Sequence, residues 1–322
     1  MSINLQSATG THYLKLGRDS LSAPTEPCFA IGLAAFNGVL WLDDQLDSIL
    51  AQKGVRVQVF VSVDSSKDGT EELVAARAIQ DTRVVMLPQN SKFQNAARNF
   101  YRLLCDINLD NFDYLAFSDQ DDIWLPDKLL RASVFMKQGE CSAYSSNVTA
   151  FWPDGSEQFI DKAQAQRQHD FLFEAAGPGS TYVFNTRLAQ EVQQFVVSRR
   201  VEVDTVSLHD WFFYAFSRSR GYHWGIDLRP GLLYRQHATN HLGANSGFSA
   251  FKSRFNSIVS GWYHSEIIKI GALCCERDDP FFHSLRTRGW YSRLFVMRHI
   301  RQCRRRWLDR LVLFVCCLLG LF

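Results

Sequence analysis

The residues most able to do chemistry are three carboxylates in the stretch Ser118–Trp124, which reads SDQDDIW. An apolar run, Tyr114–Phe117, precedes them and predicts a buried strand. Asp119 and Asp121 are two residues apart, so an extended backbone points both to one face. Such a pair favours Mg²⁺, which accepts one or two carboxylates and completes its shell with water and phosphate oxygens. The alternative is a solvated acidic turn, and the third acid, Asp122, is expected only to cap the segment after it.

Other polar residues stand where apolar runs end. Asp64 directly follows Val57–Val63 and predicts a hydrogen-bond acceptor for a base or ribose, or else the cap of a turn. Asp210 begins a helical pattern and is either a chemical group or an acid stabilised by the helix dipole. His237 follows a short apolar run and, taken alone, is more typical of a structural histidine.

The elements that must position these residues alternate along the chain. We expect strands at Cys28–Ala35, Val57–Val63, Val84–Leu87, Tyr114–Phe117, Ala143–Phe151 and Leu232–Arg235. We expect helices at Leu40–Gln52, Thr70–Gln80, Asn95–Asp106 and His209–Phe216. Alternation of this kind predicts βαβ units in a mainly parallel sheet flanked by helices. Ligands of such sheets bind beyond the carboxyl ends of the strands, where the acids lie.

Composition and charge divide the chain. Its 322 residues are 46% hydrophobic and 21% charged, as in an ordinary globular protein. Residues 1–27 predict a flexible arm without the apolar stretch of a signal peptide, so reduced thiols in the cytoplasm are expected for all eight cysteines. Residues 28–250 predict one α/β domain, and residues 251–322 a helical, basic C-terminal region.

The C-terminal region combines positive charge with a short apolar end. Residues 281–322 hold nine arginines and one acid, so the +2 of the chain and the +8 of this segment leave −6 elsewhere. The run Leu311–Phe322 is too short to span a bilayer, which needs about 20 residues. Arginines, tryptophan and a short apolar end predict attachment to an anionic membrane surface. The alternative is a helix docked on the core, and nucleic acid would not require the apolar run.

Taken together, five motifs resemble those of family 2 glycosyltransferases of the rhamnosyltransferase-like branch, which builds bacterial surface polysaccharides such as O-antigen or capsule. The motifs, in order between Cys28 and Gly247, are Phe36-Asn37-Gly38, Asp64–Thr70, Ser118–Trp124, Leu208–Trp211 and Tyr234–Gly243. The resemblance implies a GT-A fold, a nucleotide-sugar donor, and Mg²⁺ or Mn²⁺ as cofactor. It also implies transfer of a single sugar with inversion to a lipid-linked saccharide at the inner face of the cell membrane, with rhamnose from dTDP-rhamnose as a candidate donor.

The resemblance also implies a role for each matching residue. Asp210 would be the catalytic base, and Asp121 would ligate the metal. The remaining implied residues are Phe36, Asn37 and Asp64 at the nucleotide, Asp119 at ribose or metal, His237 at the metal, and Arg235 and Asn240 at the phosphates. The sequence departs from the family pattern at two places that bear on which nucleotide is bound. Val63 stands where a second acid is common, and the loop Ser65-Ser66-Lys67 differs from the usual one. The Gln-x-x-Arg-Trp motif of processive synthases is missing, which favours single-sugar addition.

Two other classes of protein compete with this interpretation. A phosphatase would use Asp119 as nucleophile and Asp121 as acid, but such enzymes place that motif after the first strand rather than the fourth. A non-catalytic scaffold that binds nucleotide sugars would not need the intact set of acids.

Overall fold

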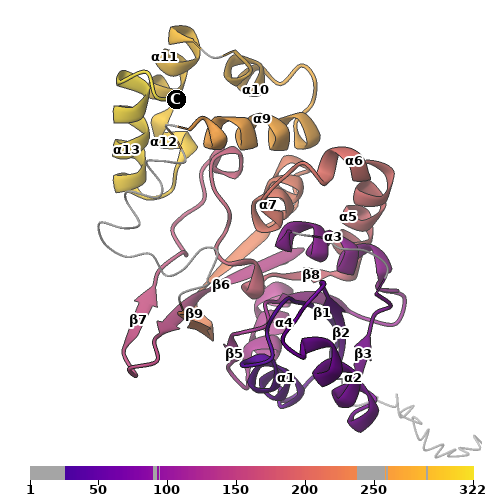
Figure 1. The fold of residues 1–322 in the computed structure, drawn as a ribbon. Coiled ribbons are helices and arrows are strands. Elements are labelled where there is room, and N and C mark those ends of the chain that lie inside the picture. The colour runs from indigo at the N-terminus through magenta and orange to yellow at the C-terminus, as the bar shows by residue number, and fades with distance from the viewer. Residues whose placement is uncertain (1–25, 90–92, 94, 238–257, 259, 288) are drawn as a thin grey trace, which may run out of the picture.

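A mixed sheet forms the centre of the protein. The computed structural model describes residues 26–89, 93, 95–237, 258, 260–287 and 289–322. In these residues the sheet has nine strands in the order β3-β2-β1-β4-β8-β6-β9-β5, with β7 paired to β6 (Figure 1). The strands are β1 Cys28–Ala35, β2 Arg56–Val63, β3 Val84–Met86, β4 Tyr114–Ser118, β5 Ile123–Trp124, β6 Ala143–Phe151, β7 Glu157–Ile160, β8 Val183–Asn185 and β9 Trp224–Arg235.

The first four strands are parallel, as expected from their alternation with helices. β1 lies between β2 and β4, with Ala35 beside Val63 and Leu33 beside Ser118. Their carboxyl ends therefore meet at one edge of the sheet. The helices that connect them bury apolar stripes: α1 (Leu42–Leu50) covers the sheet with Leu42, Leu46 and Ile49. The residues that follow β1, β2 and β4 are consequently neighbours.

The second half of the sheet is less parallel than the sequence predicts. β8 runs antiparallel to both β4 and β6, whereas β6 and β9 are parallel with register shifts around Asn147. β5, β7 and β8 have four residues or fewer and carry no periodicity from which they could be predicted.

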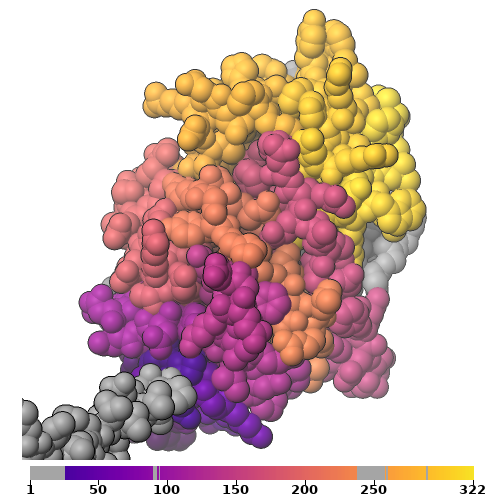
Figure 2. All heavy atoms as spheres, turned by 180° about the vertical axis from the view of Figure 1, so that it is seen from behind, coloured from indigo at the N-terminus to yellow at the C-terminus, as the bar shows by residue number. Residues whose placement is uncertain are grey.

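Helices cover the sheet and extend beyond it. They are α1 Leu42–Leu50, α2 Thr70–Gln80, α3 Ala96–Asp106, α4 Lys128–Gln138, α5 Thr186–Ser198, α6 Arg200–Val203, α7 His209–Ser219, α9 Trp262–Cys274, α10 Pro280–Leu285, α11 Trp290–Arg298, α12 Ile300–Cys303 and α13 Trp307–Leu318, with short 3₁₀ turns η1 Asp170–Leu172 and η2 Gly179–Thr181. From behind, the C-terminal helices α9 to α13 form a cap over one end of the molecule (Figure 2). We call these helices the C-terminal cap. Their buried residues belong to the same apolar core as α7, which includes Phe213, Ile267 and Leu313.

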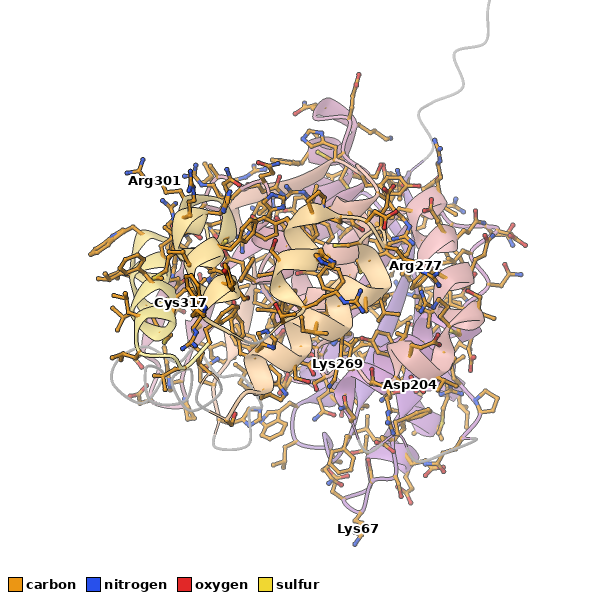
Figure 3. All side chains as sticks on the ribbon, turned by 90° about the horizontal axis from the view of Figure 1, so that it is seen from above. Lys67, Asp204, Lys269, Arg277, Arg301 and Cys317 are labelled. Carbon is orange, nitrogen blue, oxygen red and sulfur yellow. The ribbon has the colours of Figure 1, made fainter. Side chains whose placement is uncertain are left out.

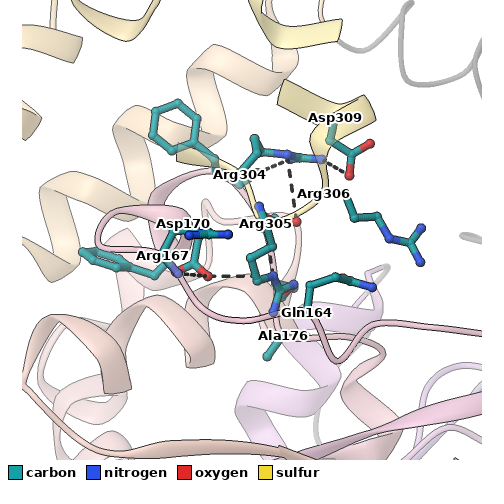
Figure 4. A network of polar contacts seen from close by, with 12 residues as sticks. Gln164, Arg167, Asp170, Ala176, Arg304, Arg305, Arg306 and Asp309 are labelled. Carbon is teal, nitrogen blue, oxygen red and sulfur yellow. Dashed lines mark hydrogen bonds and ion pairs between the residues drawn. The ribbon is translucent and has the colours of Figure 1, made fainter. Parts of the chain in front are cut away.

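Two arginines anchor this cap to the α/β part. Arg304 donates to the carbonyl of Phe173 at 2.6 Å and pairs with Asp309 at 3.3 Å. Arg305, only 4% exposed, donates its backbone N–H to Glu174 at 2.6 Å and lies 3.7 Å from Asp170 (Figure 4). Part of the positive charge that predicted a membrane surface is therefore neutralised inside the protein.

The apolar end of the chain fits neither alternative alone: one side of α13 is docked on the core, and the other side stays exposed, as membrane attachment would require. Leu313, Cys316 and Cys317 of α13 are buried in the core, whereas Leu311 and Leu318 on its other side are more than half exposed. In the part of the chain that the structure describes, no helix has both the length and the apolarity needed to cross a bilayer. The predicted boundary near residue 250 lies outside the described residues.

The cysteines are all free thiols. Five are buried and three, Cys28, Cys105 and Cys275, are half-buried. Burial is the main cause that raises the pKa of each thiol above its usual value.

Candidate active site

The loops after β1 and β2 form one side of the site. Asp64 is 7% exposed, and its Oδ1 accepts hydrogen bonds from the backbone N–H groups of Ser65 at 2.7 Å and Phe93 at 3.0 Å. Asn37 adopts a left-handed backbone with φ of 47°, and its Oδ1 accepts from the N–H of Lys67 at 2.9 Å. Phe36 is half exposed. The structure thus brings together the three residues expected at the nucleotide.

Gln120 joins these loops to the acidic motif. Its Oε1 accepts from the N–H of Phe36 at 2.6 Å, and its Nε2 donates to the carbonyl of Phe36 at 2.9 Å. A side chain at Gly38 would collide with this amide. Gln120, the middle residue of Asp-Gln-Asp, therefore holds the acidic motif at a fixed distance from the loops after β1 and β2.

Four carboxylates gather at the end of β4. Burial raises the pKa of Asp119 to about 7, the charges of Asp121 and Asp210 add to that effect, and Lys128 opposes it. Burial raises the pKa of Tyr234 on β9, and so do the charges of the same three acids and Asp122. Asp210 is distant in sequence from the acidic motif, and the fold brings it into the same electrostatic cluster.

Beneath the cluster lies a buried lysine. Lys128 is fully buried, donates from Nζ to the carbonyl of Ser180 at 2.9 Å, and sits 3.0 Å from the centroid of the Trp124 ring. Burial lowers its pKa well below the usual value, while the charges of Asp122 and Asp119 act against that shift. Asp122 is also fully buried, and burial raises its pKa. The expectation that Asp122 only caps the segment after it is wrong, because it faces the interior instead.

Asp210 stands in the first turn of α7. Burial raises its pKa to about 6, and this shift is partly offset by the N–H of Trp211 and the charge of Lys162. Its neighbour His209 stacks on Phe100 with ring centroids 3.9 Å apart, and burial lowers its pKa to about 3, so the ring is neutral. The site therefore holds a carboxylate that exchanges its proton near neutral pH.

The turn Gly177–Ser180 presses against the start of this helix. A Cβ at Gly179 would lie 2.5 Å from His209 Nε2 and 3.4 Å from Asp210 Cβ. Only glycine allows such a close approach, so this turn brings backbone to the wall of the site.

A buried glutamate of the C-terminal cap holds the loop that leads into α7. Glu266 on α9 is fully buried and accepts from the backbone N–H of Ser207 at 2.8 Å and from its hydroxyl at 3.2 Å. Lys269 pairs with it at 2.7 Å and also donates to the carbonyl of Thr205 at 3.0 Å. α9 also packs against α7 (Figure 1), so the cap contacts both the helix that carries Asp210 and the loop that leads into it.

Arg235 at the end of β9 and His237 just after it, expected to bind phosphates and metal, have structural partners. His237 Nε2 lies 2.8 Å from Asp121 Oδ2, and its ring stacks on Trp41. Arg235 donates to the carbonyl of Asp121 at 2.9 Å and pairs with Asp44 at 3.1 Å. Both therefore position the acidic motif, and their roles at the metal and the phosphates stay predictions. Asn240 lies outside the described residues.

The acids fit a divalent cation only in part. Among the described residues, no group of three or more His, Cys, Asp or Glu side chains forms a complete set of ligands. Asp119 and Asp121 supply two carboxylates whose mutual repulsion a cation would relieve. Such a pair suits an ion whose other ligands are water and substrate phosphates.

Comparison with known proteins supplies the family. Residues 30–182 match the family model described as "Glycosyl transferase family 2". The chain is 38% identical over 291 residues to the "dTDP-rhamnosyl transferase RfbG" of Shigella flexneri, covering 90% of this chain and 100% of the relative. The chain belongs to glycosyl transferase family 2. The protein is a glycosyltransferase, as its motifs predict.

Solved structures agree on the fold. TarS 1-349 of S. aureus in complex with UDP-GlcNAc has a TM-score of 0.55 at 12% identity, covering 91% of this chain and 80% of that one. The mannosyltransferase PcManGT of Pyrobaculum calidifontis in complex with GDP-Man and Mn²⁺ has a TM-score of 0.51 at 15% identity, covering 92% and 74%. The expected GT-A fold of this glycosyltransferase is confirmed.

Several residues of the glycosyltransferase site escape sequence reasoning. Gln120, Lys128 and Glu266 act through partners that lie from 52 to 84 residues away along the chain. The one signal in the sequence is for Lys128, because a lysine soon after an acidic motif is a candidate counter-charge for buried acids. Trp124 and Trp211 are buried and belong to the core.

Proposed function

We propose that the chain is an inverting, metal-dependent glycosyltransferase that adds one rhamnose, drawn from dTDP-rhamnose, to a lipid-linked saccharide. The donor is inferred from the similarity over nearly the whole chain to a dTDP-rhamnosyl transferase. The reaction belongs to the synthesis of a surface polysaccharide, O-antigen or capsule, at the inner face of the cell membrane. The observation that carries the proposal is the gathering of Asp210 with Asp119 and Asp121 in one cluster.

Each group of residues has a part in this reaction. Phe36, Asn37 and Asp64 hold the nucleoside, with Phe36 offering a half-exposed aromatic ring and Asp64 a carboxylate acceptor. Asp119 and Asp121 would hold the metal ion, which when bound neutralises the charge that develops on the departing diphosphate. Gln120 keeps these two groups at a constant separation.

Asp210 acts on the acceptor. Its carboxylate takes the proton of the acceptor hydroxyl, whose oxygen attacks the anomeric carbon from the side opposite the diphosphate. The bond between that carbon and the diphosphate oxygen breaks, and its electron pair leaves with the diphosphate. A single displacement of this kind inverts the anomeric centre. A pKa of about 6 suits the role, because the carboxylate is ionised at pH 7 yet still basic.

The test combines donor turnover with a variant of the base. The purified chain is incubated with a panel of nucleotide sugars including dTDP-rhamnose, a lipid-linked acceptor, and Mg²⁺, Mn²⁺ or a chelator. We expect transfer from dTDP-rhamnose that stops on chelation. Asp210→Asn keeps dTDP binding and loses transfer by about 10²–10⁴-fold, whereas the exposed control Asp110→Asn keeps both. Absence of turnover with every donor and metal would refute the enzymatic proposal, and equal loss of binding would make Asp210 structural.

A further inference from the structure

The outward faces of α11 and α13 carry an unusual concentration of apolar side chains. Among the described residues, nine large ones are 42% to 71% exposed there, and we call them the outer apolar surface: Trp290, Tyr291, Leu294, Trp307, Leu308, Leu311, Val315, Leu318 and Leu319. On α13 the exposed positions recur every three or four residues and so share one side of the helix. No charged residue occurs after Arg310, so this side is uninterrupted.

The two faces belong to one end of the molecule. α11 and α13 pack against each other, and a side chain at Gly320 would collide with the guanidinium of Arg293 on α11. Both helices lie in the cap, away from the sheet (Figure 1). Leu313, Cys316 and Cys317 already dock the opposite side of α13 on the core. The exposed side is therefore surplus to folding, and apolar surface of this extent on a soluble protein marks an interaction site.

Positive charge borders this surface. Arg298 and Arg301 are exposed, and Arg301 extends from the edge of the molecule in Figure 3. Burial lowers the pKa of Arg310, and the neighbouring charges of Arg167 and Arg301 lower it further, which shows that three guanidinium groups gather here. Arg304 and Arg305 do not contribute, since the carboxylates of Asp309 and Asp170 neutralise them.

We propose that the outer apolar surface is the membrane-docking face of the protein and lies in the interface of a bilayer rich in anionic lipids. Tryptophan and tyrosine favour the boundary between acyl chains and headgroups, leucine and valine favour the acyl side, and arginine favours anionic headgroups. This combination fits a lipid surface better than a second protein, whose apolar patch would not require a basic border. The inference deepens the proposed function, because it places the enzyme where a lipid-linked acceptor lies.

Point substitutions test this surface without removing Arg304 and Arg305, which hold the cap on the α/β part. A deletion of residues 304–322 would expose the buried partners of Arg305, so its result would report folding instead. We compare the full chain with Leu311→Glu/Leu318→Glu and with Ile79→Glu/Val201→Glu, a control pair on α2 and α6 that is 86% and 81% exposed. Flotation with phosphatidylcholine vesicles, with and without phosphatidylglycerol, measures binding, and thermal melts check that each variant is folded.

We expect the wild type and the control pair to bind phosphatidylglycerol vesicles, and the leucine pair to bind at least about tenfold less, because each buried leucine contributes apolar transfer energy. Equal binding by all three, or no binding by the wild type, would overturn the inference. So would a wild-type dimer in sedimentation that the leucine pair converts to a monomer without any vesicle binding. Donor turnover is measured in the same samples: vesicle binding without turnover contradicts the proposed function alone, and turnover without binding contradicts this inference alone.

Discussion

Glu266 offers a test of whether the C-terminal cap sets the geometry of catalysis. Its carboxylate accepts two hydrogen bonds from Ser207 and pairs with Lys269. Glu266→Ala removes all three interactions and leaves the backbone N–H of Ser207 without its acceptor. Glu266→Gln keeps one oxygen acceptor and removes the charge. Both variants alter the loop that leads to Asp210, and neither touches the donor loops after β1 and β2.

The magnitudes follow from burial. Hydrogen bonds to a buried charged group contribute about 1.5–3 kcal/mol each, and part of that is recovered by local relaxation. We therefore expect Glu266→Ala to lower the free energy of unfolding by about 2–4 kcal/mol, and Glu266→Gln by about 1–2 kcal/mol. A displacement of the base by about 1 Å costs roughly 10²-fold in rate, so kcat should fall by about 10–100-fold while the KM for the donor stays within about twofold.

The assay is steady-state transfer with the donor varied at saturating acceptor, paired with urea unfolding of each variant. Glu202→Gln is the matched control, because Glu202 is an exposed glutamate paired with Arg199 on the surface, and both kcat and the unfolding midpoint should stay at wild-type values. Wild-type kcat in Glu266→Gln, or a rise in donor KM that matches the fall in kcat, would show that the cap does not position Asp210.

Two further predictions concern the base and its surroundings. With saturating Mg²⁺, which keeps Asp119 ionised, kcat/KM should rise about tenfold per pH unit up to about pH 6 and level off above it, because Asp210 must be ionised to accept a proton; a rate independent of pH between 4.5 and 7 would argue against Asp210 as the base. Gly179→Ala should reduce transfer by at least about tenfold, because its Cβ would collide with His209 beside Asp210. Gly289→Ala is the control, because its Cβ meets nothing within 4 Å and transfer should stay unchanged. Equal activities of the two variants would show that the turn Gly177–Ser180 shifts to accommodate the extra methyl group without moving Asp210.

Part of the fold could be predicted because its signals are local. β1 and β6 have the expected bounds, and Asn95 accepts from the N–H of Ala97 at the start of α3. Short strands such as β8 form only through pairing with β4 and β6, which are distant in the chain. A three-residue strand carries too few positions for a period to be recognised.

The site, like the fold, could be predicted only in part. Asp64, Asp119 and Asp121 follow apolar runs, so strand ends alone place them near one another. Their supports could not be predicted, because Gln120 and Lys128 depend on contacts that only the folded chain provides. α13 shows a different difficulty: nearly every residue after Arg310 is apolar, so no period distinguishes the docked side from the exposed one.

The free cysteines make the protein suitable for site-specific labelling. Thiol reagents react with the thiolate, and all eight native thiols are buried or half-buried with raised pKa values, so their reaction at neutral pH is slow. A new thiol at an exposed position, such as Leu318→Cys, should react well before them. A single fluorophore or spin label could then be placed on the protein without first removing any native cysteine, and its signal would report how deeply that residue enters a bilayer.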